Sequence, residues 1–174
     1  MAIPLYDASV LSYLQILDAA KGFLGKGLDW SKQNGVDPEE LLEARLYEDM
    51  RPLRFQVHQI VFHSASAIEA IRGGVLDFGA PRPGHTYAEL QAEVDKAAAT
   101  LRALDAAEVN GWEGKDVAFR VPGKGDRIFT AEGFVLIFSL PNFHFHAATA
   151  YGILRSKGAP VGKMDFMGAL RLKG

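Results

Sequence analysis

The chain has 174 residues, of which 48% are hydrophobic and 23% charged, and this composition is that of an ordinary globular protein. Its net charge of −2 offers no basic surface, so we expect neither a nucleic-acid nor a membrane partner. The absence of cysteine excludes disulfides, thiolate metal ligands and a cysteine nucleophile, and it fits a cytoplasmic protein.

The chain is predicted to form one domain over residues 1–174, built mainly from long helices. Leucines at helical spacing predict a first long helix over residues 5–34, and Gly35 provides its C-terminal stop. Asp37 followed by Pro38 is typical of a helix start, here of a short helix. A second long helix is predicted from about residue 50 to 72, where two consecutive glycines end it.

Residues 75–84 carry two prolines and two glycines, and they are predicted to form a loop. Thr86 and Glu89 follow this loop and form a capping box, in which each side chain satisfies a backbone N–H of the other residue. The capping box predicts the start of a third long helix, which reaches about residue 104.

The hydrophobic period changes after the third helix. Residues 116–121 (DVAFRV) alternate between apolar and polar, and the turn PGKGD leads into RIFT, so these segments predict a small β-hairpin. A fourth long helix is predicted from about residue 130 to 158. The fold class that follows is all-α: a four-helix bundle with a small β-hairpin between the third and fourth helices.

The fourth helix contains the most apolar part of the chain. Residues 134–154 are about long enough to cross a bilayer, but polar groups in the middle of the segment would be costly in lipid. These polar residues are Ser139, Asn142, His144 and His146. A helix that is apolar on all sides is otherwise one buried inside a protein, and we expect that here.

Four stretches carry a resemblance to a known family: LYDASV, EARLYEDMRPLRFQVHQIVFH, TYAELQAEVDKAAATLRAL and LPNFHFHAATAYGILRSKGAPVGKMDF. Over nearly its whole length the chain resembles domain-of-unknown-function family 1993, within the DinB/YfiT-like superfamily of four-helix bundles. The resemblance implies a DinB-like bundle and, because members are often dimeric, a homodimer. Characterised relatives resemble metal-dependent enzymes, several of which transfer low-molecular-weight thiols. Their site is typically one histidine of the second helix and a His-x-x-x-His pair of the fourth.

The second predicted helix contains two histidines. His58 and His63 lie on opposite flanks of its apolar stripe, so one straight helix cannot direct both at one ion. His63 matches the place of the superfamily's second-helix ligand better than His58. The structural alternative is that His63 is a flank histidine, hydrogen-bonded where two helices meet.

The fourth helix offers His144 and His146, whose directions differ by about 200° because they are two residues apart. The partners of His146 at a spacing of four are Asn142 and Ala150, so the superfamily's histidine pair is incomplete. The Asn142 amide is a poor substitute for imidazole on zinc or nickel. This leaves His63 and His146 as the candidate ligands of a divalent metal.

The third ligand of such a site is not determined by the sequence. Water, or a carboxylate such as Glu69 or Asp95, could complete a weakly bound ion. His144 is expected to face a neighbouring helix, a second subunit or solvent. His85, in the segment PRPGHT, is interpreted as a surface residue.

Pro141 indicates a candidate binding pocket for a small molecule. It cannot donate a hydrogen bond to the carbonyl of Ile137, so the helix is expected to kink there. The freed carbonyl and Asn142 would form a polar spot in an aromatic wall that includes Phe138 and Tyr151. Asn142, Tyr151 and Phe138 are therefore the candidate ligand-binding residues. The alternative is that the kink only improves packing.

Two functions remain open at this point. The first is a DinB-like bundle protein with a small-molecule pocket between its helices, which lacks the full three-histidine metal site. The second is a metal-dependent hydrolase or small-thiol-transferase-like enzyme that uses His63 and His146.

Overall fold

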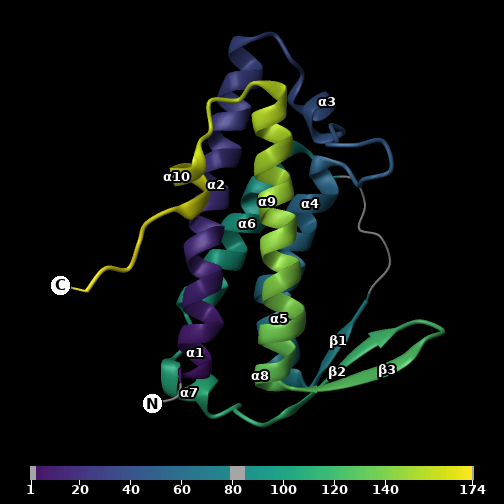
Figure 1. Ribbon diagram of the computed structural model, residues 1–174, viewed down its shortest axis with the longest axis vertical. Helices are drawn as coiled ribbons and strands as arrows, with labels where there is room; N and C mark the ends of the chain where they lie inside the picture. Colours follow the sequence, from purple (N-terminus) through teal and green to yellow (C-terminus); the bar gives the residue numbers. More distant parts are fainter. Residues whose placement is uncertain (1–2, 79–84, 174) are drawn as a thin grey trace.

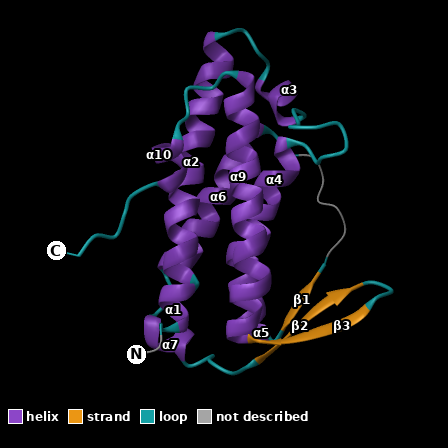
Figure 2. Cartoon of the chain, in the orientation of Figure 1, coloured by secondary structure: helices purple, strands orange, loops and turns teal. Residues whose placement is uncertain are grey.

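The computed structural model describes residues 3–78 and 85–173, and it shows a mostly helical protein with a small sheet (Figures 1 and 2). The two helices of the N-terminal region are α1 (Leu5–Ala8) and α2 (Val10–Gln33), followed by the short α3 (Pro38–Leu42). The next helical run is α4 (Leu53–Val61), the π-helical segment η1 (Phe62–Ser66) and α5 (Ala67–Gly73). After it come α6 (Tyr87–Arg102) and α7 (Ala106–Asn110), then α8 (Ala131–Gly133), the π-helical η2 (Phe134–Ser139), α9 (Leu140–Lys157) and α10 (Lys163–Met167).

The long helices run alongside one another, and the core lies between them (Figure 1). α2 packs against α6 and α9, while α4 packs against the same two helices from the other side. The side chains that fill this space are fully buried and mostly aromatic or branched; the largest are Tyr13, Phe23, Phe134 and Phe143. Each such burial contributes about 1.5–3 kcal/mol, which is why the apolar stripes of these helices determine how they pack.

Local sequence signals set the starts of several helices as predicted. Asp37 caps α3 by accepting a hydrogen bond from the N–H of Glu39. Thr86 and Glu89 form the expected capping box at the start of α6. None of the described helices is both long and apolar enough to cross a membrane. The expectation that residues 134–154 are buried on all sides is wrong, because Leu136, Ile137 and Phe145 of this stretch are exposed.

Two π-helical segments, η1 and η2, face each other in the core. The Ser139 hydroxyl of η2 donates a hydrogen bond of 2.7 Å to the carbonyl of His63 in η1, and it lies 2.7 Å from the Tyr13 hydroxyl of α2. η2 ends directly before α9, whose second residue is Pro141, so a π-helical stretch precedes the proline at which a kink is predicted. Segments of this kind are frequent at functional sites.

The sheet has three strands, in the order β1 (Val75–Asp77), β2 (Asp116–Val121) and β3 (Gly125–Thr130). β2 and β3 form the predicted antiparallel hairpin. β1 pairs with β2 in parallel, and this corrects the prediction that the whole of residues 75–84 is a loop. A three-residue strand is too short to show a period, and only the burial of Leu76 distinguishes it. The rest of that predicted loop, residues 79–84, lies outside the described residues.

Candidate functional site

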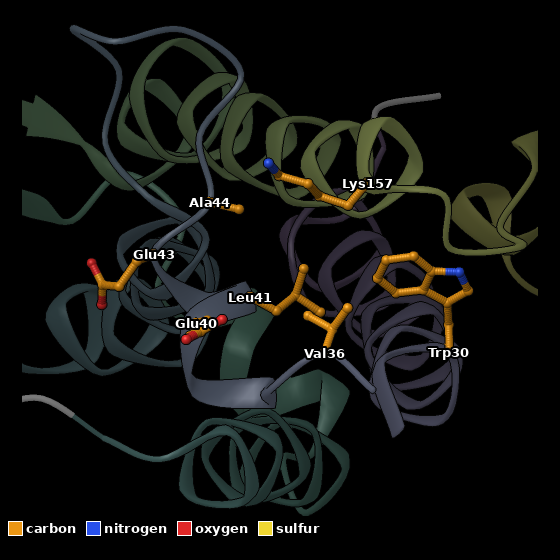
Figure 3. A pocket seen from close by; sticks show the side chains of 7 residues that line it. All are labelled: Trp30, Val36, Glu40, Leu41, Glu43, Ala44 and Lys157. Atoms are coloured by element: carbon orange, nitrogen blue, oxygen red, sulfur yellow. The ribbon is translucent and has the colours of Figure 1, made fainter. Parts of the chain in front are cut away.

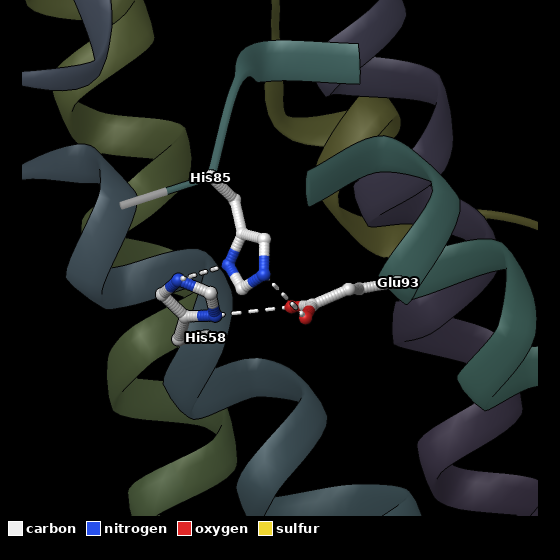
Figure 4. Close-up of side chains that lie close together, drawn as sticks. All are labelled: His58, His85 and Glu93. Carbon is white, nitrogen blue, oxygen red and sulfur yellow. Dashed lines mark hydrogen bonds and ion pairs between the residues drawn. The ribbon is translucent and has the colours of Figure 1, made fainter. Parts of the chain in front are cut away.

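Two histidines and a glutamate from separate parts of the chain meet between α4 and the start of α6 (Figure 4). His58 belongs to α4, His85 directly precedes the capping residue of α6, and Glu93 lies in the second turn of α6. His58 Nδ1 lies 3.0 Å from Glu93 Oε2, and His58 Nε2 lies 3.2 Å from His85 Nδ1. His85 Nε2 is 3.7 Å from Glu93 Oε1, so each side chain contacts the other two.

The carboxylate sets the direction of the first of these contacts. A carboxylate can only accept, so His58 donates to Glu93 from Nδ1. The second bond joins His58 Nε2 and His85 Nδ1, and the tautomers of the two rings determine which nitrogen donates. The group is therefore a connected hydrogen-bond chain that ends on a carboxylate.

The segment that carries His85 is held against α4 by Arg54. Arg54 lies one turn before His58 on α4, and its guanidinium donates to the backbone carbonyl of His85. The same guanidinium pairs with Glu43, whose Oε1 lies 2.9 Å from Arg54 Nε. Because Arg54 and His58 are four residues apart, they share one face of α4, and both contact His85.

The short helix α3 adds a second restraint on the same segment. Glu39 Oε1 accepts a hydrogen bond of 2.9 Å from the N–H of Tyr87, the first residue of α6. The capping box starts α6 at this point, and Glu93 follows Glu89 by four residues on the same face of the helix. Local folding thus places His85 and Glu93 opposite His58.

The group lies at the surface but is only partly open to solvent. The side chain of His58 is 10% exposed, that of Glu93 23% and that of His85 25%. Solvent and small molecules can reach Glu93 and His85, while burial holds His58 in place. The combination of one buried and two partly exposed side chains suits a binding site better than a purely structural ion pair.

These residues can hold a divalent metal ion. One ligand atom of each residue lies within 4.8 Å of the other two. Tetrahedral zinc, with bonds near 2.0 Å to nitrogen and oxygen, needs ligands about 3.3 Å apart, a separation that rotation of these side chains can reach. Two imidazoles and one carboxylate are a ligand set used by catalytic zinc and non-haem iron, and three protein ligands leave coordination positions open.

A second histidine pair lies deeper, where η1 meets α9. The rings of His63 and His146, the two ligands predicted from the sequence, are nearly parallel, with centroids 5.7 Å apart. His146 is buried whereas His144 is exposed, as their spacing predicted. His146 Nδ1 donates to Gln56 Oε1 over 2.7 Å.

Burial keeps this second pair neutral. It lowers the pKa of His63 to about 3, an effect to which the nearby His146 adds, and it lowers the pKa of His146 to about 4. Among the described residues, His63 Nδ1 is buried without a hydrogen-bond partner. An orphaned imidazole nitrogen beside a second neutral imidazole is the kind of feature that a metal ion or a water satisfies.

The protein side chains considered from the sequence as further ligands of this pair have other partners among the described residues. Asn142 donates through Nδ2 to the carbonyl of Phe138 in its own helix. Glu69 pairs with Arg72 and Asp95 with Lys21, both at exposed positions. Among the described residues, three or more potential ligands converge only at His58, His85 and Glu93.

The three residues predicted to bind a small molecule do not form one group in the structure. Phe138 packs in an aromatic cluster and lies beside Asn142. Tyr151 instead contacts the rings of Phe23 and Phe166. Neither of the two cavities described next is lined by any of the three.

The first cavity has a volume of about 300 Å³ and lies between the end of α2, α3 and the end of α9 (Figure 3). Its lining residues are Trp30, Val36, Glu40, Leu41, Glu43, Ala44 and Lys157. The second has a volume of about 420 Å³ and lies between α6 and the run from α4 through η1 and α5 to β1. Glu93 belongs both to its lining and to the His–His–Glu group, so this second cavity adjoins the candidate metal centre.

Sequence reasoning missed two of the three residues in the group. The sequence predicts a surface position for His85 and gives no reason to single out Glu93. His58 and His85 are 27 positions apart and belong to different elements, so no spacing rule links them. The available signal was the position of His85 directly before a capping box, which fixes it to the start of α6.

Comparison with known proteins gives a family and a fold. A family model described as "Domain of unknown function (DUF1993)" matches residues 5–167. No curated protein matches the sequence. The crystal structure of a DinB family member protein from Shewanella denitrificans is similar, with a TM-score of 0.82 and 27% sequence identity over 98% of this chain and 95% of that chain.

Proposed function

The chain belongs to the DUF1993 family, and we propose that it is a metal-binding protein whose divalent ion is held by His58, His85 and Glu93. The observation that carries the proposal is the convergence of two imidazoles and a carboxylate from three separate segments. Further support comes from the Arg54 contacts, which hold the His85 segment in place.

The proposed architecture is a DinB-like four-helix bundle. Its helices would be α2, the run from α4 to α5, α6, and the run from α8 to α9. The similarity to the DinB family member and the mutual packing of these helices support this assignment. The β2–β3 hairpin then lies between the third and fourth helices of the chain, whereas β1 follows the second. The sheet lies at the end where α5 ends and α8 begins (Figure 1).

The chemistry proposed for this site is metal-assisted reaction of a small molecule. Three protein ligands leave positions at which an ion can polarise an oxygen of a substrate or of water, as a hydrolase or a group transferase requires. His58 and His85 would supply nitrogen ligands and Glu93 an oxygen ligand. Arg54 would position His85 without touching the ion.

A second candidate site is the pair of His63 and His146. Its support is the orphaned Nδ1 of His63 and the hydrogen bond that fixes His146 on Gln56, an arrangement that leaves Nε2 of neutral His146 with a lone pair. Ala150 stands where the second imidazole of a His-x-x-x-His motif would be. The pair thus offers two ligands rather than three, so we derive no reaction step from it.

We also propose that the protein is a homodimer that buries the outward face of η2 and α9. No charged residue lies between Glu132 and Arg155 in the sequence. Leu136, Ile137 and Phe145 in this stretch are 56%, 71% and 55% exposed. A contiguous apolar face of this kind on a soluble protein is typical of an interface between proteins.

The metal proposal is tested by titrating Zn²⁺ and Co²⁺ into protein purified without a histidine tag. We expect about one equivalent to bind, with His58→Ala and Glu93→Gln losing at least tenfold in affinity. His144→Ala, at an exposed histidine of α9, is the matched control and should bind as the parent protein does.

A further inference from the structure

The cavity next to Glu93 has features of a binding site for a small molecule. It is formed where small residues of η1 and α5 face small residues of α6, so the opposing helices leave space between them. Its residues are Val61, Ala65, Ser66, Glu69, Ala70, Val75, Glu93, Lys96, Ala97 and Thr100. A volume of about 420 Å³ is in the range of ordinary small-molecule sites.

One face of α6 connects the candidate metal ligands to this cavity. Glu93, Lys96, Ala97 and Thr100 are spaced by three, one and three residues, which places them along a single side of the helix. A molecule lying in the cavity along this face therefore has Glu93 at one end and passes Lys96 one turn later. An open coordination position at Glu93 would be within reach of such a molecule.

The charges in the cavity favour an anionic ligand. Glu69 pairs with Arg72, which also pairs with Glu108, whereas Lys96 has no ion pair with any of the described residues. A divalent ion on one carboxylate and two neutral imidazoles carries a net charge of +1. The cavity then contains two positive centres, the ion and Lys96, with the apolar side chains of Ala65, Ala70 and Ala97 among the residues that line it.

We propose that this cavity binds a short-chain dicarboxylate, with one carboxylate at the metal ion and the other at Lys96. The inference rests on the metal site proposed above and names the ligand class of that site. Carboxylate oxygen is a normal ligand of a divalent ion, and an ammonium group pairs with the second carboxylate. The apolar middle of the molecule lies against the small residues of η1, α5 and α6.

The test uses the Co²⁺-loaded protein, whose visible absorption reports changes in the coordination of the ion. Glutarate and succinate are titrated against butyrate, which has a single carboxylate. We expect at least one dicarboxylate to perturb the spectrum with about tenfold higher affinity than butyrate. In Lys96→Met this advantage should disappear, while Co²⁺ affinity and butyrate binding stay unchanged. Lys163→Met, at an exposed lysine of α10, should keep the advantage.

The outcomes separate the two proposals. If Co²⁺ binds to His58, His85 and Glu93 but butyrate and the dicarboxylates bind equally, the dicarboxylate inference is overturned and the metal site remains. The dicarboxylate inference is also overturned if Lys96→Met still binds dicarboxylates more tightly than butyrate. If no stoichiometric Co²⁺ binds to the protein, both the metal site and the inference that rests on it are contradicted.

Discussion

His58 Nε2 lies 3.2 Å from Nδ1 of His85, although 27 positions separate the two residues in the sequence. Both side chains also contact Glu93, so the contact is part of a closed group and not an isolated pair. Arg54 bonds the backbone carbonyl of His85, and the capping box fixes the start of α6, the helix that contains Glu93. The first prediction therefore concerns Arg54.

Replacing Arg54 should weaken metal binding without removing a ligand. Arg54→Met loses the bonds to the His85 carbonyl and to Glu43, so His85 becomes less ordered. We expect metal affinity to fall by about tenfold, since loss of a supporting contact typically costs 10–100-fold. Arg54→Lys should recover part of the lost metal affinity.

Isothermal titration with Zn²⁺ measures the change in affinity. Arg51→Met, just before α4, is the control. Equal affinities in Arg54→Met and Arg51→Met would contradict the role of Arg54.

The buried pair of His63 and His146 should make the stability of the metal-free protein depend on pH. Their pKa values in the folded protein, about 3 and about 4, lie below the ordinary value near 6.5, so the unfolded chain binds more protons. The stabilisation is fully present above about pH 6.5 and decreases as the pH falls toward 4, by about 1.4 kcal/mol per pH unit for each histidine.

Urea denaturation at about pH 7.5 and at about pH 5 measures this dependence. His146→Gln should flatten the profile, because one of the two titrating groups is removed. His144→Ala, at an exposed position, should leave the slope close to that of the parent protein. A free energy of unfolding that stays constant over this range would show that the two buried histidines are not kept neutral by the fold.

The Ser139 hydroxyl should stabilise the contact between η1 and η2. Ser139→Ala removes its bonds to the His63 carbonyl and the Tyr13 hydroxyl and leaves two buried polar groups without this partner. We expect a loss of about 1–3 kcal/mol in the free energy of unfolding. Ser156→Ala is the control, because that hydroxyl only bonds the carbonyl of Ile153 in its own helix. Equal stabilities of the two variants would refute the role assigned to Ser139.

The apolar face of η2 and α9 should mediate self-association. Light scattering of the parent protein should give about twice the monomer mass of 19.0 kDa, and Ile137→Asp should give the monomer mass. Ile128→Asp tests specificity, because Ile128 is 61% exposed but lies on β3. A parent protein that already has the monomer mass at micromolar concentration would exclude this interface.

Much of the fold could be predicted from the sequence because its signals are local. Helical periodicity located the long helices, and the pair Thr86 and Glu89 gave the start of α6. The 200° separation of His144 and His146 predicted that only one would be buried, and His146 is that residue. Each of these inferences uses residues within one or two turns of each other.

The parts that could not be predicted depend on contacts between distant segments. The short strand β1 forms because its backbone pairs with β2, which lies about 40 residues later in the sequence. The π-helical segments η1 and η2 are joined by the hydrogen bond from Ser139 to the His63 carbonyl, a contact between distant residues that no sequence period reveals. His85 and Glu93 join His58 only when the start of α6 docks on α4, so the candidate metal centre required the tertiary structure.

The most direct test of the metal centre is the metal content of tag-free protein after dialysis against Zn²⁺, measured by elemental analysis for the parent and three variants. We predict about one equivalent in the parent and in His146→Ala, and loss of the metal in His58→Ala and His85→Ala. Protons compete with the ion for imidazole nitrogen, so occupancy should fall at acidic pH. A full equivalent of zinc retained in both His58→Ala and His85→Ala, with loss in His146→Ala, would contradict the assignment and place the ion at the buried pair instead.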